Sequence, residues 1–126
     1  MKLSNLLVIN AIVALVYGIS FVLVPATVLS LYGMTQGTSE ALAGQFFGVA
    51  LIAIGLLTWF AKNVADSEAQ RAIILALLIS DVVGIIVAVL GTLSGVMNAV
   101  GWSAVGIYLL FALGYAYFQF MKPSAS

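Results

Sequence analysis

The chain has 126 residues, of which 64% are hydrophobic and only 6% are charged, and its mean hydropathy is +1.26. Ordinary soluble domains carry about 25% charged residues, so a chain this poor in charge must meet mainly lipid rather than water. Four Lys and Arg balance four Asp and Glu, which leaves no basic patch for nucleic acid. Cys and His are both absent, which excludes disulfides, Cys/His zinc sites, His- or Cys-ligated haem and catalytic Ser–His or Cys–His pairs.

The first predicted membrane-spanning helix covers residues 6–24 and is followed directly by Pro25, which ends a helix. Its apolar run of about 19 residues is longer than the roughly 7–15 residues of a signal-peptide core, so we interpret it as a retained helix. The next segment, residues 26–32, is short and apolar. We expect it to form one or two turns at the membrane surface, with Tyr32 at the depth of the lipid headgroups.

The second predicted span covers residues 41–60 and carries a row of glycines. Gly44, Gly48 and Gly55 fall on one helical face, and the spacing of the first two is the small-x-x-x-small pattern that lets two helix backbones approach closely in lipid. We therefore predict that these glycines pack against another helix.

Residues 61–70 form a polar loop, and the third predicted span follows over residues 71–92. Ser67 and Gln70 resemble a capping box that would open this helix. Asp81 lies about ten residues into the span, or about 15 Å at 1.5 Å per residue, close to the middle of a hydrocarbon core roughly 30 Å thick. A row of small residues shares its helical face, namely Gly84, Ala88 and Gly91, and we predict that this face packs against another helix.

The fourth predicted span covers residues 102–121. In a chain with four spans, all four cations fall on one side of the membrane, namely Lys2, Lys62, Arg71 and Lys122. The positive-inside rule then places both termini in the cytoplasm. The expected fold is an all-α, antiparallel four-helix transmembrane bundle that forms one domain over residues 1–126, in a membrane such as the bacterial inner membrane.

Asp81 is also the residue with the strongest claim to function. A carboxylate at this depth costs about 2.5–3.5 kcal/mol on insertion scales, and no Lys, Arg or His lies within a span to neutralise it. We expect Asp81 to be protonated or hydrogen-bonded to neutral groups. By depth, the candidates are Asn10 of the first span and Tyr115 of the fourth, joined by Tyr17, so the four residues are predicted to form an intramembrane polar cluster.

Two runs carry a resemblance to a known kind of protein: FFGVALIAIGLLTWFAK (Phe46–Lys62) and NAVGWSAVGIYLLFALGYAYF (Asn98–Phe118). They resemble small, uncharacterised four-helix bacterial membrane proteins, and the layout is similar to that of DoxX-like four-helix proteins. The resemblance implies a four-helix bundle and assigns no residue a role.

Two hypotheses of function follow. In the first, the chain is a non-catalytic accessory or structural subunit that packs against a larger membrane complex or against copies of itself. In the second, it is a small transporter, channel or lipophilic-ligand-binding protein that uses the polar cluster around Asp81. A cluster that merely clasps two helices by hydrogen bonds fits the first hypothesis, and an acid that binds a proton or a ligand fits the second. Besides lipid, the expected partners are membrane proteins or a second copy of the chain.

Overall fold

The computed structural model describes residues 2–35 and 37–121, and all regular structure within them is helical. The α-helices in chain order are α1 (Leu3–Leu23), α2 (Pro25–Leu31), α3 (Thr38–Ala61), α4 (Ser67–Leu93) and α5 (Gly101–Ala116), and a π-helix, η1 (Tyr117–Met121), continues α5. Four helices are long and apolar enough to cross a membrane: α1, α3, α4 and the continuous stretch Gly101–Phe120. The predicted all-helical fold with four spans is therefore confirmed. Lys122, one of the four cations on which the predicted orientation depends, lies outside the described residues.

The helices extend a few residues beyond the predicted spans. α3 begins at Thr38 and α4 begins at Ser67, so each includes a polar first turn that hydropathy alone leaves out. Each of these turns carries an acid, Glu40 or Glu68, which the positive end of the helix dipole favours. Pro25 separates α1 from α2 and occupies the first turn of α2, where its missing N–H costs nothing.

The cap of α4 differs from the predicted one. The N-cap is Asp66, whose carboxylate accepts a hydrogen bond from the Ala69 backbone N–H at 3.2 Å. The predicted capping box of Ser67 and Gln70 is wrong because the Gln70 amide donates instead to the Val64 carbonyl, at 2.6 Å. An aspartate at the N-cap is as effective as a serine, so the polar loop still supplies the start of the helix.

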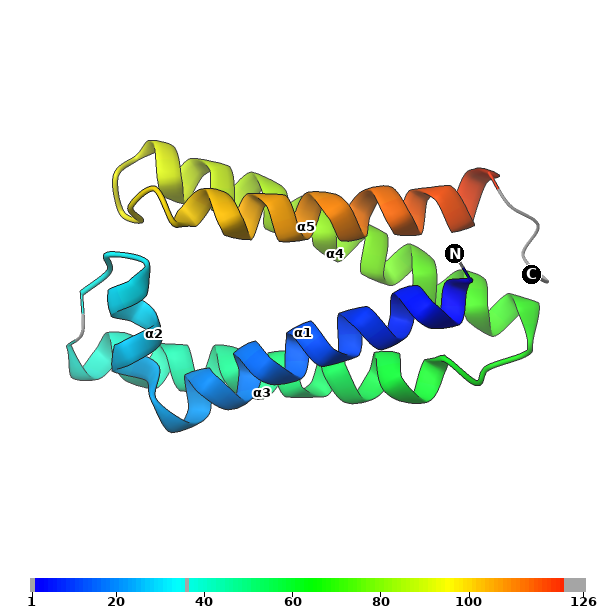
Figure 1. Ribbon diagram of the computed structural model, residues 1–126, viewed down its shortest axis with the longest axis horizontal. Helices are drawn as coiled ribbons and strands as arrows, with labels where there is room; N and C mark the ends of the chain where they lie inside the picture. Colours follow the sequence, from blue (N-terminus) through cyan, green and yellow to red (C-terminus); the bar gives the residue numbers. More distant parts are fainter. Residues whose placement is uncertain (1, 36, 122–126) are drawn as a thin grey trace.

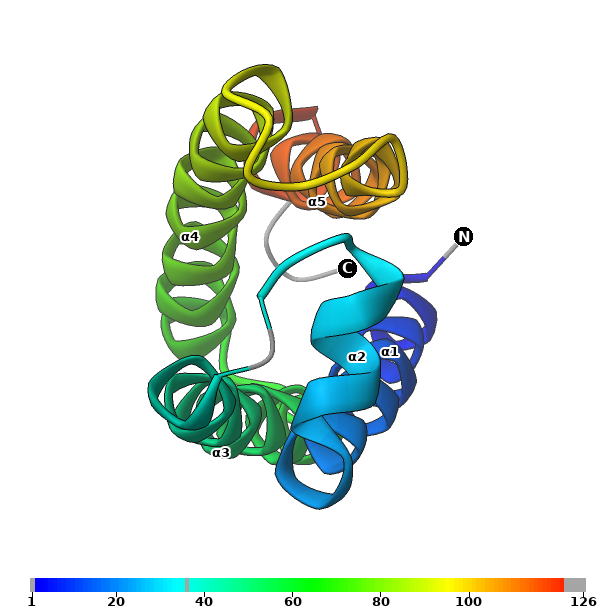
Figure 2. The ribbon, with the colours of Figure 1, turned by 90° about the vertical axis from the view of Figure 1, so that its left-hand side faces the viewer.

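The spanning helices pack in two pairs, α1 with α3 and α4 with α5 (Figures 1 and 2). α1 and α3 approach backbone to backbone. A Cβ atom added to Gly48 would lie 2.6 Å from the Gly18 carbonyl oxygen, and one added to Gly55 would lie 2.6 Å from the Leu15 side chain. Gly44 faces the ring of Phe21. The structure thus places the three predicted glycines of α3 against α1.

The two pairs meet mainly at one end of the molecule. The larger hydrophobic cluster draws on α1, α3, α4, α5 and η1, and it consists of Leu3, Leu6, Leu7, Ala61, Ile74, Leu77, Phe111, Tyr115 and Phe118. The smaller cluster, at the end that carries α2, contains Phe21, Val28 and Leu29 with partly buried neighbours from α1 to α3 and no residue of α4 or α5. The pairs are therefore firmly packed at one end and loosely joined at the α2 end.

Asn98 joins the pairs at the α2 end. The Asn98 backbone N–H donates to the Tyr32 carbonyl at 2.8 Å, and its side-chain amide donates to the Leu31 carbonyl at 3.3 Å. Gly33 makes this contact possible. Its φ of +72° suits glycine, and a Cβ atom there would lie 3.0 Å from the Asn98 side chain.

Large apolar side chains also cover the outside of every spanning helix. Examples are Val16 of α1, Phe46 of α3, Val87 of α4 and Leu110 of α5, each at least 59% exposed. Such a surface would aggregate in water and is compatible with an integral membrane protein, whose outer faces meet lipid chains.

Candidate functional site

A buried hydrogen bond links α1 to α5. The Asn10 side-chain amide donates to the Tyr115 hydroxyl oxygen, with 2.6 Å between nitrogen and oxygen. Tyr115 is 0% exposed and Asn10 is 7% exposed, so the bond forms in the interior. Because Asn10 is the donor, the phenolic proton of Tyr115 remains available for a second partner. The ring of Tyr115 stacks on that of Phe111, with centroids 6.3 Å apart, which fixes its orientation.

Asp81 lies beside this bond but does not take part in it. Its side chain is 8% exposed, and its Oδ2 atom is buried without a hydrogen-bond partner. Two tyrosines of α5, Tyr108 and Tyr115, are close enough to interact with it electrostatically. The structure therefore brings together three of the four predicted cluster residues, and it leaves the Oδ2 atom of Asp81 without a hydrogen-bond partner.

Tyr17 lies elsewhere. Its hydroxyl is 3.2 Å from that of Tyr32, and either can be the donor. The prediction that Tyr17 joins Asn10 and Tyr115 thus differs from the observed contact. The cause is α2, which folds back and brings Tyr32 within reach of α1. The ring of Tyr108 lies against Gly84, three residues along α4 from Asp81.

The predicted packing face of α4 is partly reproduced. A Cβ atom on Gly84 would lie 2.6 Å from the ring of Tyr108, so this glycine makes room for an α5 side chain. Ala88 is buried at 4% exposure. Gly91 faces the Met97 side chain in the turn between α4 and α5 and not a neighbouring helix, since it lies at the end of the span.

Two of the residues that organise this interior, Gly18 and Asn98, were not predicted from the sequence. Gly18 forms the α1 side of the closest helix contact, and the spacing Ala14-x-x-x-Gly18 is a signal that could have found it. Asn98 joins the two helix pairs, but nothing in its sequence context marks it as more than a turn residue.

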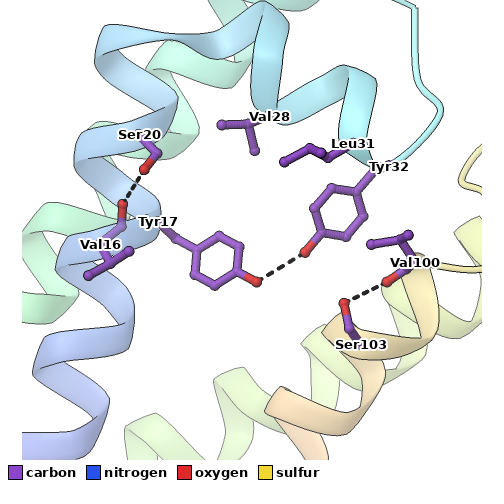
Figure 3. Close-up of a pocket in the computed structure, with 8 residues that line it drawn as sticks. All are labelled: Val16, Tyr17, Ser20, Val28, Leu31, Tyr32, Val100 and Ser103. Atoms are coloured by element: carbon purple, nitrogen blue, oxygen red, sulfur yellow. Dashed lines mark hydrogen bonds between the residues drawn. The ribbon is translucent and has the colours of Figure 1, made fainter.

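A pocket of about 410 Å³ opens at the α2 end (Figure 3). Its wall comes from α1, from α2 with its C-cap residue Tyr32, and from the first turn of α5 with its N-cap residue Val100. The lining residues are Val16, Tyr17, Ser20, Val28, Leu31, Tyr32, Val100 and Ser103. Figure 3 shows the hydroxyls of Tyr17 and Tyr32 pointing toward one another across this space.

Over residues 2–35 and 37–121, no group of three or more His, Cys, Asp and Glu side chains is placed to hold a metal ion.

No protein-family model matches this chain, and no curated protein or solved structure is significantly similar to it.

Proposed function

We propose that this protein is a small, non-catalytic membrane transporter or ligand-binding protein whose working group is Asp81, in the interior beside Asn10 and Tyr115. The observation that carries this proposal is the buried Oδ2 atom of Asp81, which has no hydrogen-bond partner. A structural clasp would use the carboxyl group. Here Asn10 and Tyr115 join α1 to α5 by a hydrogen bond without Asp81, so the acid is left for another role.

The proton is the first ligand to consider. An ionised carboxylate in hydrocarbon costs several kcal/mol, and the nearest cation along α4, Arg71, lies ten residues from Asp81 at the start of the helix. A proton removes that charge and needs no cavity. The phenolic proton of Tyr115, which Asn10 leaves free, is a donor that can compensate the ionised form. Asp81 thus has a means of existing in both states, as proton-linked transport requires.

Proton exchange at Asp81 is directly measurable. In full-length protein reconstituted in lipid vesicles, we expect infrared difference spectra across a pH step to show one protonated-carboxyl band that titrates. Isotope exchange in D₂O should shift this band, which identifies it as a carboxyl group. A spectrum whose carboxyl signals all belong to the exposed loop acids would contradict the proposal.

The proposed arrangement in the membrane is an antiparallel bundle with both termini in the cytoplasm, in a membrane such as the bacterial inner membrane. Lys2, Lys62 and Arg71 support this orientation, since all precede or follow a span on the same side. The Lys62 ammonium also lies 4.0 Å from the centre of the Trp59 ring, a pairing suited to the membrane surface. A reporter fused to the C-terminus is expected to be active in the cytoplasm, and activity on the opposite side would overturn this orientation. The similarity in layout to DoxX-like proteins stays a prediction.

The role of accessory subunit is the second candidate, and one feature of α4 favours it. Ala72, Ala76 and Ser80 are all exposed and repeat every four residues, so another helix could approach α4 closely along this face. The native mass in a mild detergent separates the candidates. Recovery in a large assembly with other polypeptides would favour the subunit, and recovery alone or as a small homo-oligomer favours a binding or transport role.

A further inference from the structure

The pocket at the α2 end has an exposed apolar rim. The rim residues Val16, Leu31 and Val100 are 59%, 61% and 44% exposed, whereas Val28, also in the wall, is 6% exposed. The volume of about 410 Å³ lies within the roughly 300–1,000 Å³ typical of small-molecule sites. Its rim belongs to the apolar outer surface of the helices, so a molecule dissolved in the bilayer can enter sideways.

Asn98 holds three wall residues of the pocket together. It donates to the carbonyls of Leu31 and Tyr32, and its side-chain oxygen accepts a hydrogen bond from the Val100 backbone N–H at 3.0 Å. Asn98 therefore ties the α2 wall to the α5 wall at the end where the two helix pairs are otherwise loosely joined.

The polar groups of the pocket specify the chemistry of an occupant. Ser20 donates to the Val16 carbonyl at 2.7 Å and Ser103 donates to the Val100 carbonyl at 2.6 Å, so both serine oxygens remain only as acceptors. Tyr17 and Tyr32 share one hydrogen bond, which leaves one phenolic proton free to donate. All eight lining residues are uncharged.

We infer that this pocket binds a neutral lipid whose head carries hydroxyl or carbonyl oxygens, such as a diacylglycerol or a quinone. The free phenolic proton donates to a carbonyl of the head, and the chain lies along Val16, Leu31 and Val100. A head that also carries a hydroxyl, as in a diacylglycerol, donates it to a serine oxygen. A charged head would be desolvated there without a counterion, which disfavours fatty acids and cationic amphiphiles. This second site is independent of Asp81, since the two involve different residues.

Equilibrium binding to the full chain in phosphatidylcholine nanodiscs tests this inference, with radiolabelled dioleoylglycerol and decylubiquinone as neutral probes and oleate as the charged one. We expect saturable binding of at least one neutral probe, which also identifies the source of the head chemistry. Ser103→Phe, which fills the pocket from an exposed helix position, should abolish that binding. Tyr17→Phe with Tyr32→Phe removes the hydroxyls while keeping both rings, and should weaken affinity about three- to tenfold per lost hydrogen bond.

A control variant and a separate readout make the result decisive. Tyr117→Phe removes an exposed hydroxyl from η1, away from the pocket, and should leave affinity unchanged. Uptake of the lipid probes measures this pocket and the infrared carboxyl band measures Asp81, so failure here and failure of the proposed function are distinguishable. Equal, non-saturable uptake by the wild-type chain and the Ser103→Phe variant would overturn the inference. So would tighter binding of oleate than of either neutral probe, and if Ser103→Phe fails to fold, the tyrosine variants decide.

Discussion

Replacing Gly48 with leucine is expected to separate α1 from α3. A Cβ atom at this position would lie 2.6 Å from the Gly18 carbonyl oxygen and 2.9 Å from the Cβ atom of Phe21. Neither atom can move without moving the α1 backbone, so the helices must separate along their closest contact. Overpacking a well-packed interior typically costs about 1–3 kcal/mol, and a clash with backbone belongs at or above the upper end of that range.

Detergent-resistance and unfolding measurements on the purified protein check this prediction, and the chain offers a matched control. At Gly106 of α5 an added Cβ atom would meet nothing within 4 Å, so Gly106→Leu makes the same chemical change in open space. We expect that variant to unfold like the wild-type chain. Equal stability of Gly48→Leu and Gly106→Leu would show that the Gly18–Gly48 contact does not hold the helices together.

Replacing Asp81 with asparagine is expected to abolish the titrating carboxyl band and any proton-linked movement of a solute, while the fold remains intact. Asparagine has nearly the same shape, is neutral at every pH, and replaces an oxygen, Oδ2, that makes no hydrogen bond. The free energy of unfolding should therefore change by less than about 1 kcal/mol. Infrared spectra of the reconstituted variant, together with its unfolding curve, measure both effects.

Asp66→Asn is the matched control, because it removes one carboxylate from the loop before α4. Asparagine caps a helix about as well as aspartate, so α4 should still begin at Ser67. The interior carboxyl band should persist in this variant. Persistence of the same band in the Asp81→Asn variant would remove Asp81 from the proposed function, and a large loss of stability would assign it a structural role instead.

Hydropathy was sufficient to predict the four spans because each is an almost uninterrupted apolar run, and lipid imposes helices on such runs. Depth was sufficient to place Asn10 and Tyr115 in one cluster, since residues at matching distances from the membrane surface can meet across two packed helices. Both were predicted as partners of Asp81, whereas in the structure they bond to each other. The glycine face of α3 was visible in its spacing. These features depend on local period and on rise per residue, which a sequence contains.

What sequence reasoning missed depends on where the irregular segments fold. Tyr17 pairs with Tyr32 because α2 turns back toward α1, and no periodicity encodes that angle. The pocket exists because the two helix pairs are loosely joined at one end, where Asn98 ties a turn to the end of α2. Asp66 and Ser67 are neighbours with equal capping ability, so only the geometry of the loop chooses between them.

The pairing of α1 with α3 and of α4 with α5 has a consequence for biogenesis. Each pair buries its closest contacts within a continuous stretch of chain, and the loop of residues 62–66 between them contains exposed positions at Asn63, Ala65 and Asp66. The first pair can thus be complete in the bilayer while the second is still being synthesised. Two polypeptides divided at this loop and produced together should find one another in the membrane, so the covalent link between the halves is dispensable for assembly.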